Sequence, residues 1–220
     1  MLASELISNS IPPLRTADSV QTALDRMVEF KLFHLPLVNE AQFLGIIAEE
    51  ELMQNRHPEE SLGGLSLTII NPFVYQDAHV YDVIRLCHQL QLSIIPVLDY
   101  KKNYLGVISE HNLIEYAASI CAVNEPGGII VLEINNRNNS LSHMARIVEG
   151  DNAQVLSSYV QTFHDSTRIE VTLKINKTEL SGIISSFERH NYQVKAVFNS
   201  TITDDGTEDR YNSLMNYLNV

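Results

Sequence analysis

An internal repeat constrains the fold of this 220-residue chain more than any other feature. Residues 33–53 read FHLPLVNEAQFLGIIAEEELM, and residues 93–114 read SIIPVLDYKKNYLGVISEHNLI. The two prolines of this pattern, at 36 and 96, are 60 residues apart, whereas its two glycines, at 45 and 106, are 61 apart. Because insertions are tolerated best in turns, the extra residue predicts a turn between proline and glycine, and the repeat indicates a duplicated folding unit.

Each copy has the same predicted order of elements. An apolar stripe with helical spacing precedes two short apolar strands and a closing helix. In the second copy, Asp77 is the expected N-cap of the first helix. The elements fall at residues 20–28, 33–38, 43–48 and 49–56 in the first copy, and at residues 80–87, 93–98, 104–109 and 110–123 in the second.

This element order, with the prolines and glycines at matching places, resembles the cystathionine β-synthase (CBS) domain. Two tandem copies resemble a Bateman module, which covers roughly residues 1–123. The resemblance implies two βαββα-type units packed around a pseudo-two-fold axis, with adenosine nucleotides as common ligands in the clefts between the units.

The resemblance also implies candidate ligand-binding residues. In that family a small hydroxyl residue follows the second strand, and three positions later a carboxylate binds the ribose diol. The second copy has Ser109 and Asn112 at these places, whereas the first has Ala48 and Glu51. Hydrogen bonds to charged groups are stronger than neutral ones, so an amide in place of the carboxylate should weaken ribose binding roughly tenfold. Helix N-capping explains Ser109 and Asn112 equally well.

Two further candidates precede the prolines. In the family, a basic residue two positions before the proline meets phosphate, and here this residue is His34 in the first copy and Ile94 in the second. Ser93, one position earlier, is expected to contact ribose or phosphate. The alternative for His34 is a half-buried histidine at a strand edge.

The C-terminal part has a different pattern. Its strands and helices are expected in the order βαββαβ, the split ferredoxin-like arrangement, over residues 127–199. Order and length resemble the ACT domain, a regulatory fold that usually dimerises and often binds amino acids. Its ligand loop corresponds to Asn138, Asn139 and Ser140, where serine replaces the family's glycine. A plain loop and helix cap is the alternative.

The predicted fold class is therefore α+β, with two CBS-type units followed by an ACT-type domain, similar to acetoin-utilization-type CBS/ACT regulatory proteins. The expected boundaries are 1–57 and 67–123 for the two CBS domains, with a linker at 58–66. The ACT-like domain is expected at 127–199, and an acidic, then amphipathic tail at 200–220.

Charge and motifs exclude several function classes. The net charge of −12 and the lack of any basic cluster argue against nucleic-acid binding. No apolar run approaches the roughly 18 residues of a membrane span. The two cysteines are expected to be free thiols in a reducing cytoplasm, and the histidines show no metal-ligand spacing. No catalytic motif is present, so we expect no enzyme and no metal.

Two hypotheses from different classes remain. The first is a cytoplasmic, homodimeric regulatory sensor of an adenosine nucleotide or S-adenosylmethionine, which passes the ligand-induced change to its ACT-like domain and acts either alone or on a separate target protein. The second is a structural dimerisation module with degenerate ligand sites. An amino-acid sensor acting through the ACT-like loop is a further alternative.

Overall fold

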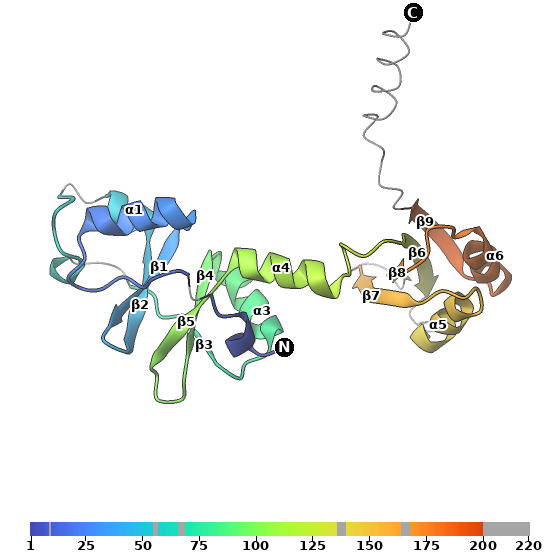
Figure 1. Cartoon of the computed structure of the whole chain (residues 1–220), viewed down its shortest axis with the longest axis horizontal. Coiled ribbons are helices and arrows are strands. Elements are labelled where there is room, and N and C mark those ends of the chain that lie inside the picture. The colour runs from blue at the N-terminus through green and yellow to red at the C-terminus, as the bar shows by residue number, and fades with distance from the viewer. Residues whose placement is uncertain (9, 55–56, 66–68, 136–139, 164–167, 200–220) are drawn as a thin grey trace, which may run out of the picture. The chain divides into compact units, whose positions relative to one another are not determined.

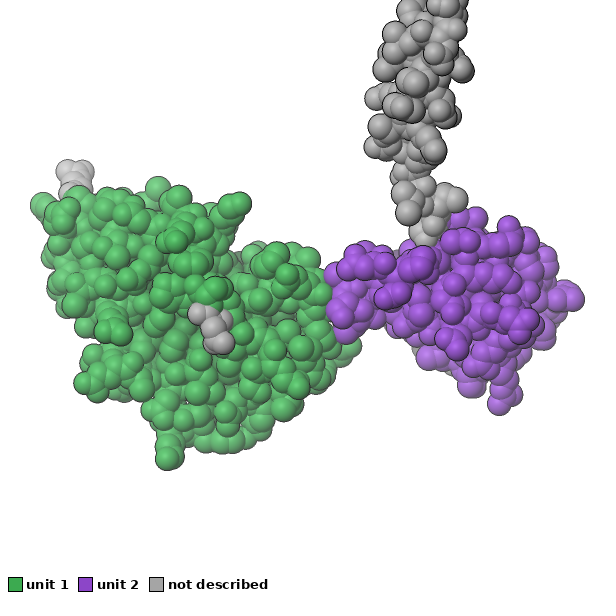
Figure 2. Space-filling view, viewed as in Figure 1, with its two compact units in different colours: residues 1–116 green, residues 117–220 purple. Residues whose placement is uncertain are grey.

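The computed structural model describes residues 1–8, 10–54, 57–65, 69–135, 140–163 and 168–199. The chain forms two compact units, Met1–Tyr116 and Ala117–Val220, which are coloured separately in Figure 2. The tail at 200–220, which is expected to be acidic and then amphipathic, lies outside the described residues.

The first repeat of unit 1 follows the predicted order. A short 3-10 helix at Ala3–Leu6 precedes α1 (Val20–Phe30), β1 (His34–Asn39), β2 (Gln42–Ala48) and α2 (Glu49–Met53). Ser19 caps the start of α1, and its side chain accepts a hydrogen bond from the Thr22 backbone N–H. Lys31 caps the end of the helix in the left-handed conformation, with φ 55°.

The second repeat has the same order of elements and in addition a leading strand, β3. After a 3-10 helix at Leu62–Gly64 come β3 (Val74–Tyr75), α3 (Val80–Leu90), β4 (Ile94–Leu98), β5 (Tyr104–Ser109) and α4 (Glu110–Ile120). The expected cap of α3 was wrong, because His79 caps this helix. The carboxylate of Asp77 instead accepts a hydrogen bond from the Tyr100 hydroxyl.

The two hairpins lie side by side and match in detail (Figure 1). Hairpin β1–β2 is antiparallel with a register shift after Leu37, and β4–β5 has the same shift after Val97. The strands turn between Asn39 and Gln42 in the first hairpin and between Leu98 and Tyr104 in the second. The extra residue of the second copy therefore lies in its turn, as predicted.

The segment that precedes each repeat pairs with the hairpin of the other repeat, an exchange that the sequence did not reveal. Ser8 donates its backbone N–H to Val107 of the second hairpin, and Ile46 of the first hairpin donates to Ile70. Glycines at 45 and 106, with φ near 150°, allow this approach. A Cβ there would meet the Ile69 side chain and the Ile7 side chain, respectively.

Matching positions of the two repeats form one hydrophobic core. The inward residues of α1 and α3 and the middle of both hairpins are buried, as the apolar stripes predict. The matching buried pairs include Val20 and Val80, Ala23 and Val83, Met27 and Cys87, Leu35 and Ile95, and Ile47 and Ile108.

Unit 2 is a four-stranded antiparallel sheet with two helices on one face. Its elements are β6 (Gly128–Asn135), α5 (Leu141–Glu149), β7 (Val155–Thr162), β8 (Arg168–Ile175), α6 (Ser181–Arg189) and β9 (Gln193–Asn199). The strand order is β7-β8-β6-β9. The core lies between sheet and helices and includes Ile130, Leu132, Val171, Leu173, Met144, Ile183 and Phe187.

These observations confirm the predicted fold class. The second repeat has the order βαββα, and the first differs only in that its leading strand is reduced to a parallel bridge between Leu14 and Leu37. Unit 2 has the βαββαβ order of the split ferredoxin-like arrangement, consistent with an ACT-like domain. The finer domain boundaries within the chain stay predictions.

Candidate functional site

Ser109 and Asn112 form a reciprocal cap at the start of α4. The Asn112 side-chain oxygen Oδ1 accepts from the Ser109 backbone N–H at 3.1 Å and from its hydroxyl at 2.7 Å. Ser109 Oγ in turn accepts from the Asn112 backbone N–H at 3.2 Å. Because a backbone N–H can only donate, Oδ1 must be the atom that faces Ser109. The Asn112 amide nitrogen Nδ2 therefore points its two donors elsewhere.

Ser93 and His34 connect the two repeats. The Ser93 backbone N–H donates to His34 Nδ1 at 3.2 Å, and the Ser93 hydroxyl lies 3.1 Å from the same nitrogen. Ser93 Oγ also accepts from the Phe33 backbone N–H at 3.2 Å. Burial lowers the pKa of His34, and the nearby carboxylate of Glu110 opposes this only in part. His34 is thus held as a neutral imidazole whose Nδ1 accepts.

One cleft, which we call the Ser109 cleft, collects most of the predicted site residues. It has a volume of about 470 Å³. Three polar or charged residues are buried in the described part of the chain, and two of them, Ser93 and Ser109, line this cleft. The lining residues are Ser8, Ser10, Ile11, Phe30, Lys31, Leu32, Ser93, Ser109, Glu110, His111, Asn112 and Ile114.

A second cleft, the His34 cleft, lies at the matching place of the first repeat. Its volume is also about 470 Å³, but its chemistry differs. Ala48 occupies the place of Ser109 and brings no hydroxyl. The lining residues are Phe33, His34, Ala48, Glu49, Glu50, Met53 and Gln54. This cleft is unfavourable for an anion, because Glu49 and Glu50 line it and its described lining contains no lysine or arginine.

The structure therefore separates the predicted nucleotide-binding residues. Ser93, Ser109 and Asn112 line one cleft, whereas His34 lines the other and contacts Ser93. Sequence reasoning missed Lys31, Ser8 and Ser10. Lys31 reaches the Ser109 cleft because α1 ends there, and the two serines reach it because their segment crosses to the second repeat.

The predicted loop of unit 2 is only partly described. Ser140 caps α5, and its side chain accepts from the His143 backbone N–H at 3.4 Å. Asn138 and Asn139 lie outside the described residues. The described Ser140 thus supports the helix-cap interpretation of this position.

Within the described ranges, no group of three or more His, Cys, Asp or Glu side chains is placed to hold a metal ion. No helix of the described chain is long and apolar enough to cross a bilayer.

Known structures show a similar fold. AcuB, an acetoin utilization protein of Vibrio cholerae, matches with a TM-score of 0.50 at 15% identity, over 56% of this chain and 95% of that chain. A CBS domain pair/ACT domain protein from Thermotoga maritima matches with a TM-score of 0.48 at 19% identity, over 53% of this chain and 96% of that chain. CBSX2, solved in complex with AMP, matches with a TM-score of 0.47 at 19% identity, over 54% of this chain and 97% of that chain.

The sequence itself matches a family model. The model of the CBS domain covers residues 3–57 and 68–119, which hold the two repeats of unit 1. Proteins with such domain pairs are generally regulatory. Residues 3–57 and 68–119 are therefore a tandem pair of CBS domains, a Bateman module.

Proposed function

We propose that this protein is a non-catalytic regulatory sensor that binds an adenosine ligand in the Ser109 cleft. AMP, ADP, ATP and S-adenosylmethionine are the candidates that the family suggests. The observation that carries the proposal is that Ser93, Ser109, Asn112 and Lys31 converge from both repeats on one cleft. Its volume of about 470 Å³ falls in the usual range of small-molecule sites.

The geometry supports a specific role for Asn112. With Oδ1 committed to Ser109, its Nδ2 donates to the ribose oxygens and cannot accept from the diol hydroxyls. A carboxylate would cap Ser109 with one oxygen and accept from the diol with the other. Ribose binding here is thus weaker than with an aspartate, but it retains one directed donor.

Regulation would follow from the fact that several separate segments of the chain form the walls of the cleft. Its walls come from both repeats and from the N-terminal segment with Ser8 and Ser10. A ligand that binds one packing arrangement of these walls more tightly shifts the protein toward that arrangement. The part that responds to this shift would be the ACT-like unit of the same chain or a separate target protein in the cytoplasm.

Exposed apolar side chains favour a homodimer. Each unit presents large apolar residues on its surface, and dimers usually cover such residues. In unit 1 they include Val28, Met53, Tyr81 and Ile114, and in unit 2 Tyr159, Val160, Phe163 and Phe198. We propose self-association through both the CBS pair and the ACT-like domain at 127–199, with light scattering as the test.

A thermal-shift screen of the full chain tests the sensor function. A ligand at 100 times its Kd adds about 2.7 kcal/mol of stability, which should raise Tm by roughly 5–10 °C. Asn112→Ala should lose this shift, but it also removes the Ser109 cap, so its own Tm must be measured without ligand. No shift with any adenosine compound would contradict the sensor function.

Other outcomes would favour the alternatives. A stable dimer that ignores every ligand supports the structural module with degenerate sites, which Ala48 and the acidic His34 cleft favour for the first repeat. A shift with an amino acid alone would place sensing in the loop with Asn138, Asn139 and Ser140.

A further inference from the structure

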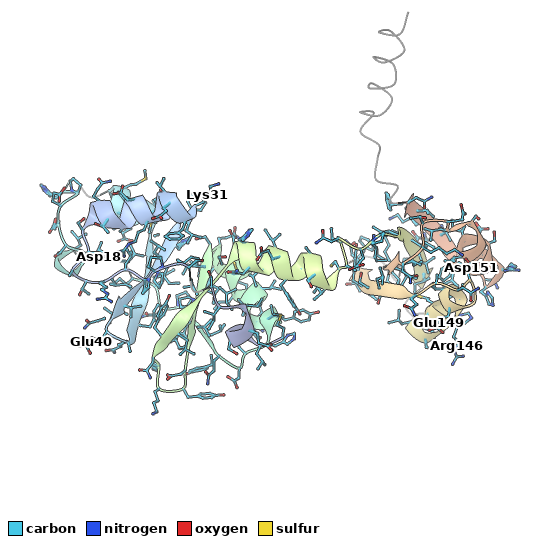
Figure 3. All side chains as sticks on the ribbon, in the orientation of Figure 1. Asp18, Lys31, Glu40, Arg146, Glu149 and Asp151 are labelled. Carbon is cyan, nitrogen blue, oxygen red and sulfur yellow. The ribbon has the colours of Figure 1, made fainter. Side chains whose placement is uncertain are left out.

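The Ser109 cleft contains a lysine that the family pattern did not indicate. Lys31 directly follows α1, and Figure 3 labels it at that end of the helix. Of the described residues that line the cleft, it is the one lysine or arginine. We propose that Lys31 makes this cleft select a phosphorylated adenosine ligand over uncharged adenosine and over the cationic S-adenosylmethionine. The inference rests on the proposed function and deepens it.

The backbone conformation at Lys31 fixes the position from which its side chain extends. Its N–H donates to the carbonyls of Met27 and Val28, and its φ of 55° lies in the left-handed region. Glycine adopts that region with the least strain, so the turn alone does not favour lysine. Gln91 has the same conformation, with φ 54°, at the matching end of α3, yet it does not line the described His34 cleft.

Charge explains what the lysine would do. In the described part of the chain, the Lys31 ammonium is in no ion pair, and its side chain is exposed. The protein carries a net charge of −12, and Glu110 lines the same cleft, so a phosphate approaches against repulsion. Lys31 is the group that offsets this repulsion locally. The His34 cleft has Glu49 and Glu50 instead, so phosphate is not expected there.

The preference for phosphorylated ligands follows directly from the positive charge of Lys31. An ammonium attracts the phosphate of AMP or ATP, leaves adenosine unaffected and repels the sulfonium and amine of S-adenosylmethionine. The contribution should fall as salt rises, because Lys31 is exposed to solvent.

Titration calorimetry on the full chain at low salt tests the inference, with adenosine, AMP, ATP and S-adenosylmethionine as probes. Lys31→Gln should weaken AMP and ATP binding about tenfold, as loss of one charged hydrogen bond predicts. Adenosine affinity should stay the same. In the wild-type protein AMP should bind more tightly than both adenosine and S-adenosylmethionine.

Two glycine variants separate charge from backbone strain. Lys31→Gly and the matched control Gln91→Gly both relieve a left-handed residue, so both should raise Tm in the absence of ligand. Only Lys31→Gly should lose AMP affinity. A lysine that merely supports the turn would give equal AMP affinity in both variants.

The outcomes distinguish the two proposals. If adenosine and AMP bind the wild-type protein equally, or if Lys31→Gln leaves AMP affinity unchanged, the role of Lys31 is wrong and the sensor function stands. If none of the four probes binds, both the sensor function and the role of Lys31 are wrong.

Discussion

At the scale of single residues, Tyr104 is the clearest imperfection of the core. Its hydroxyl is buried, and no described group is a hydrogen-bond partner for it. Burial also raises the pKa of Tyr104, because the phenolate would be desolvated. An unsatisfied buried hydroxyl costs about 1–3 kcal/mol, whereas an apolar group of the same shape costs little.

Tyr104→Phe should therefore raise the free energy of unfolding, by about 1 kcal/mol. Urea denaturation measures this as a higher midpoint with an unchanged slope. Tyr192→Phe is the matched control, because the Tyr192 hydroxyl bonds His143 Nδ1 at 2.8 Å, and its loss should lower the midpoint. A lower midpoint for Tyr104→Phe would mean that its hydroxyl has a partner.

Asn112 allows a gain of function at the same scale. Asn112→Asp keeps an oxygen for the Ser109 cap and adds one that accepts from the ribose diol. AMP affinity should rise roughly tenfold, the difference between a neutral and a charged hydrogen bond. Calorimetry with AMP and 2′-deoxy-AMP checks this, because the gain should be smaller for the deoxy compound. Equal gains would show that the new carboxylate does not meet the diol.

At the scale of elements, the exchanged segments leave different amounts of space for a side chain at Gly45 and at Gly106. A Cβ on Gly106 would meet only the Ile7 side chain at close range, with the Ser8 carbonyl at 3.7 Å. A Cβ on Gly45 would also lie 2.9 Å from the Ile70 carbonyl oxygen, which cannot move without the backbone. Both alanine substitutions also strain φ values near 150°.

Gly106→Ala and Gly45→Ala should each lower stability by more than about 1 kcal/mol. Adding Ile7→Ala should restore part of the loss in Gly106→Ala, because it removes the clashing side chain. Adding Ile69→Ala should not restore Gly45→Ala to the same extent. Chemical denaturation of the four variants decides this, and equal rescue would contradict the difference in backbone contact.

The His34–Ser93 connection makes stability depend on pH. Burial lowers the pKa of His34 in the folded state, so the folded protein favours the neutral imidazole. This stabilisation is present above the unfolded pKa of about 6.5 and is lost as pH falls through the lower folded pKa. The wild-type protein should thus lose more stability between pH 7.5 and 5 than His34→Gln, as measured by denaturation. Equal losses would exclude His34 as a contributor.

The elements also show which parts of the fold could be predicted from the sequence. The hairpins, helices and the turn with the extra residue followed from periodicity and from the repeat, because these signals are local. The exchange of residues 7–8 and 69–70 did not follow, because two short segments pair with strands about 100 and 24 residues away, and no periodic pattern records such pairing. Lys31 was missed for a related reason, since its place in the cleft depends on how the repeats pack.

At the scale of the whole molecule, the two units have separate hydrophobic cores. In the described residues, the core of unit 1 ends at Leu113 and that of unit 2 begins at Ile130, and they share no residue. Stability can therefore differ between the units, since each core opens as its own cooperative group. The described residues that line the Ser109 cleft all belong to unit 1.

Saturating AMP should consequently slow hydrogen exchange in the core of unit 1 by up to about 100-fold at 100 times its Kd, where residues exchange through unfolding of that unit. Peptides from β4 and β5 report this change, and peptides from β6 and β8 serve as the internal control. Unchanged exchange in β6 and β8 would show that the units unfold independently. If AMP slowed exchange equally in both units, their unfolding would be coupled, and a change of packing at the cleft would then reach the ACT-like sheet through the fold itself.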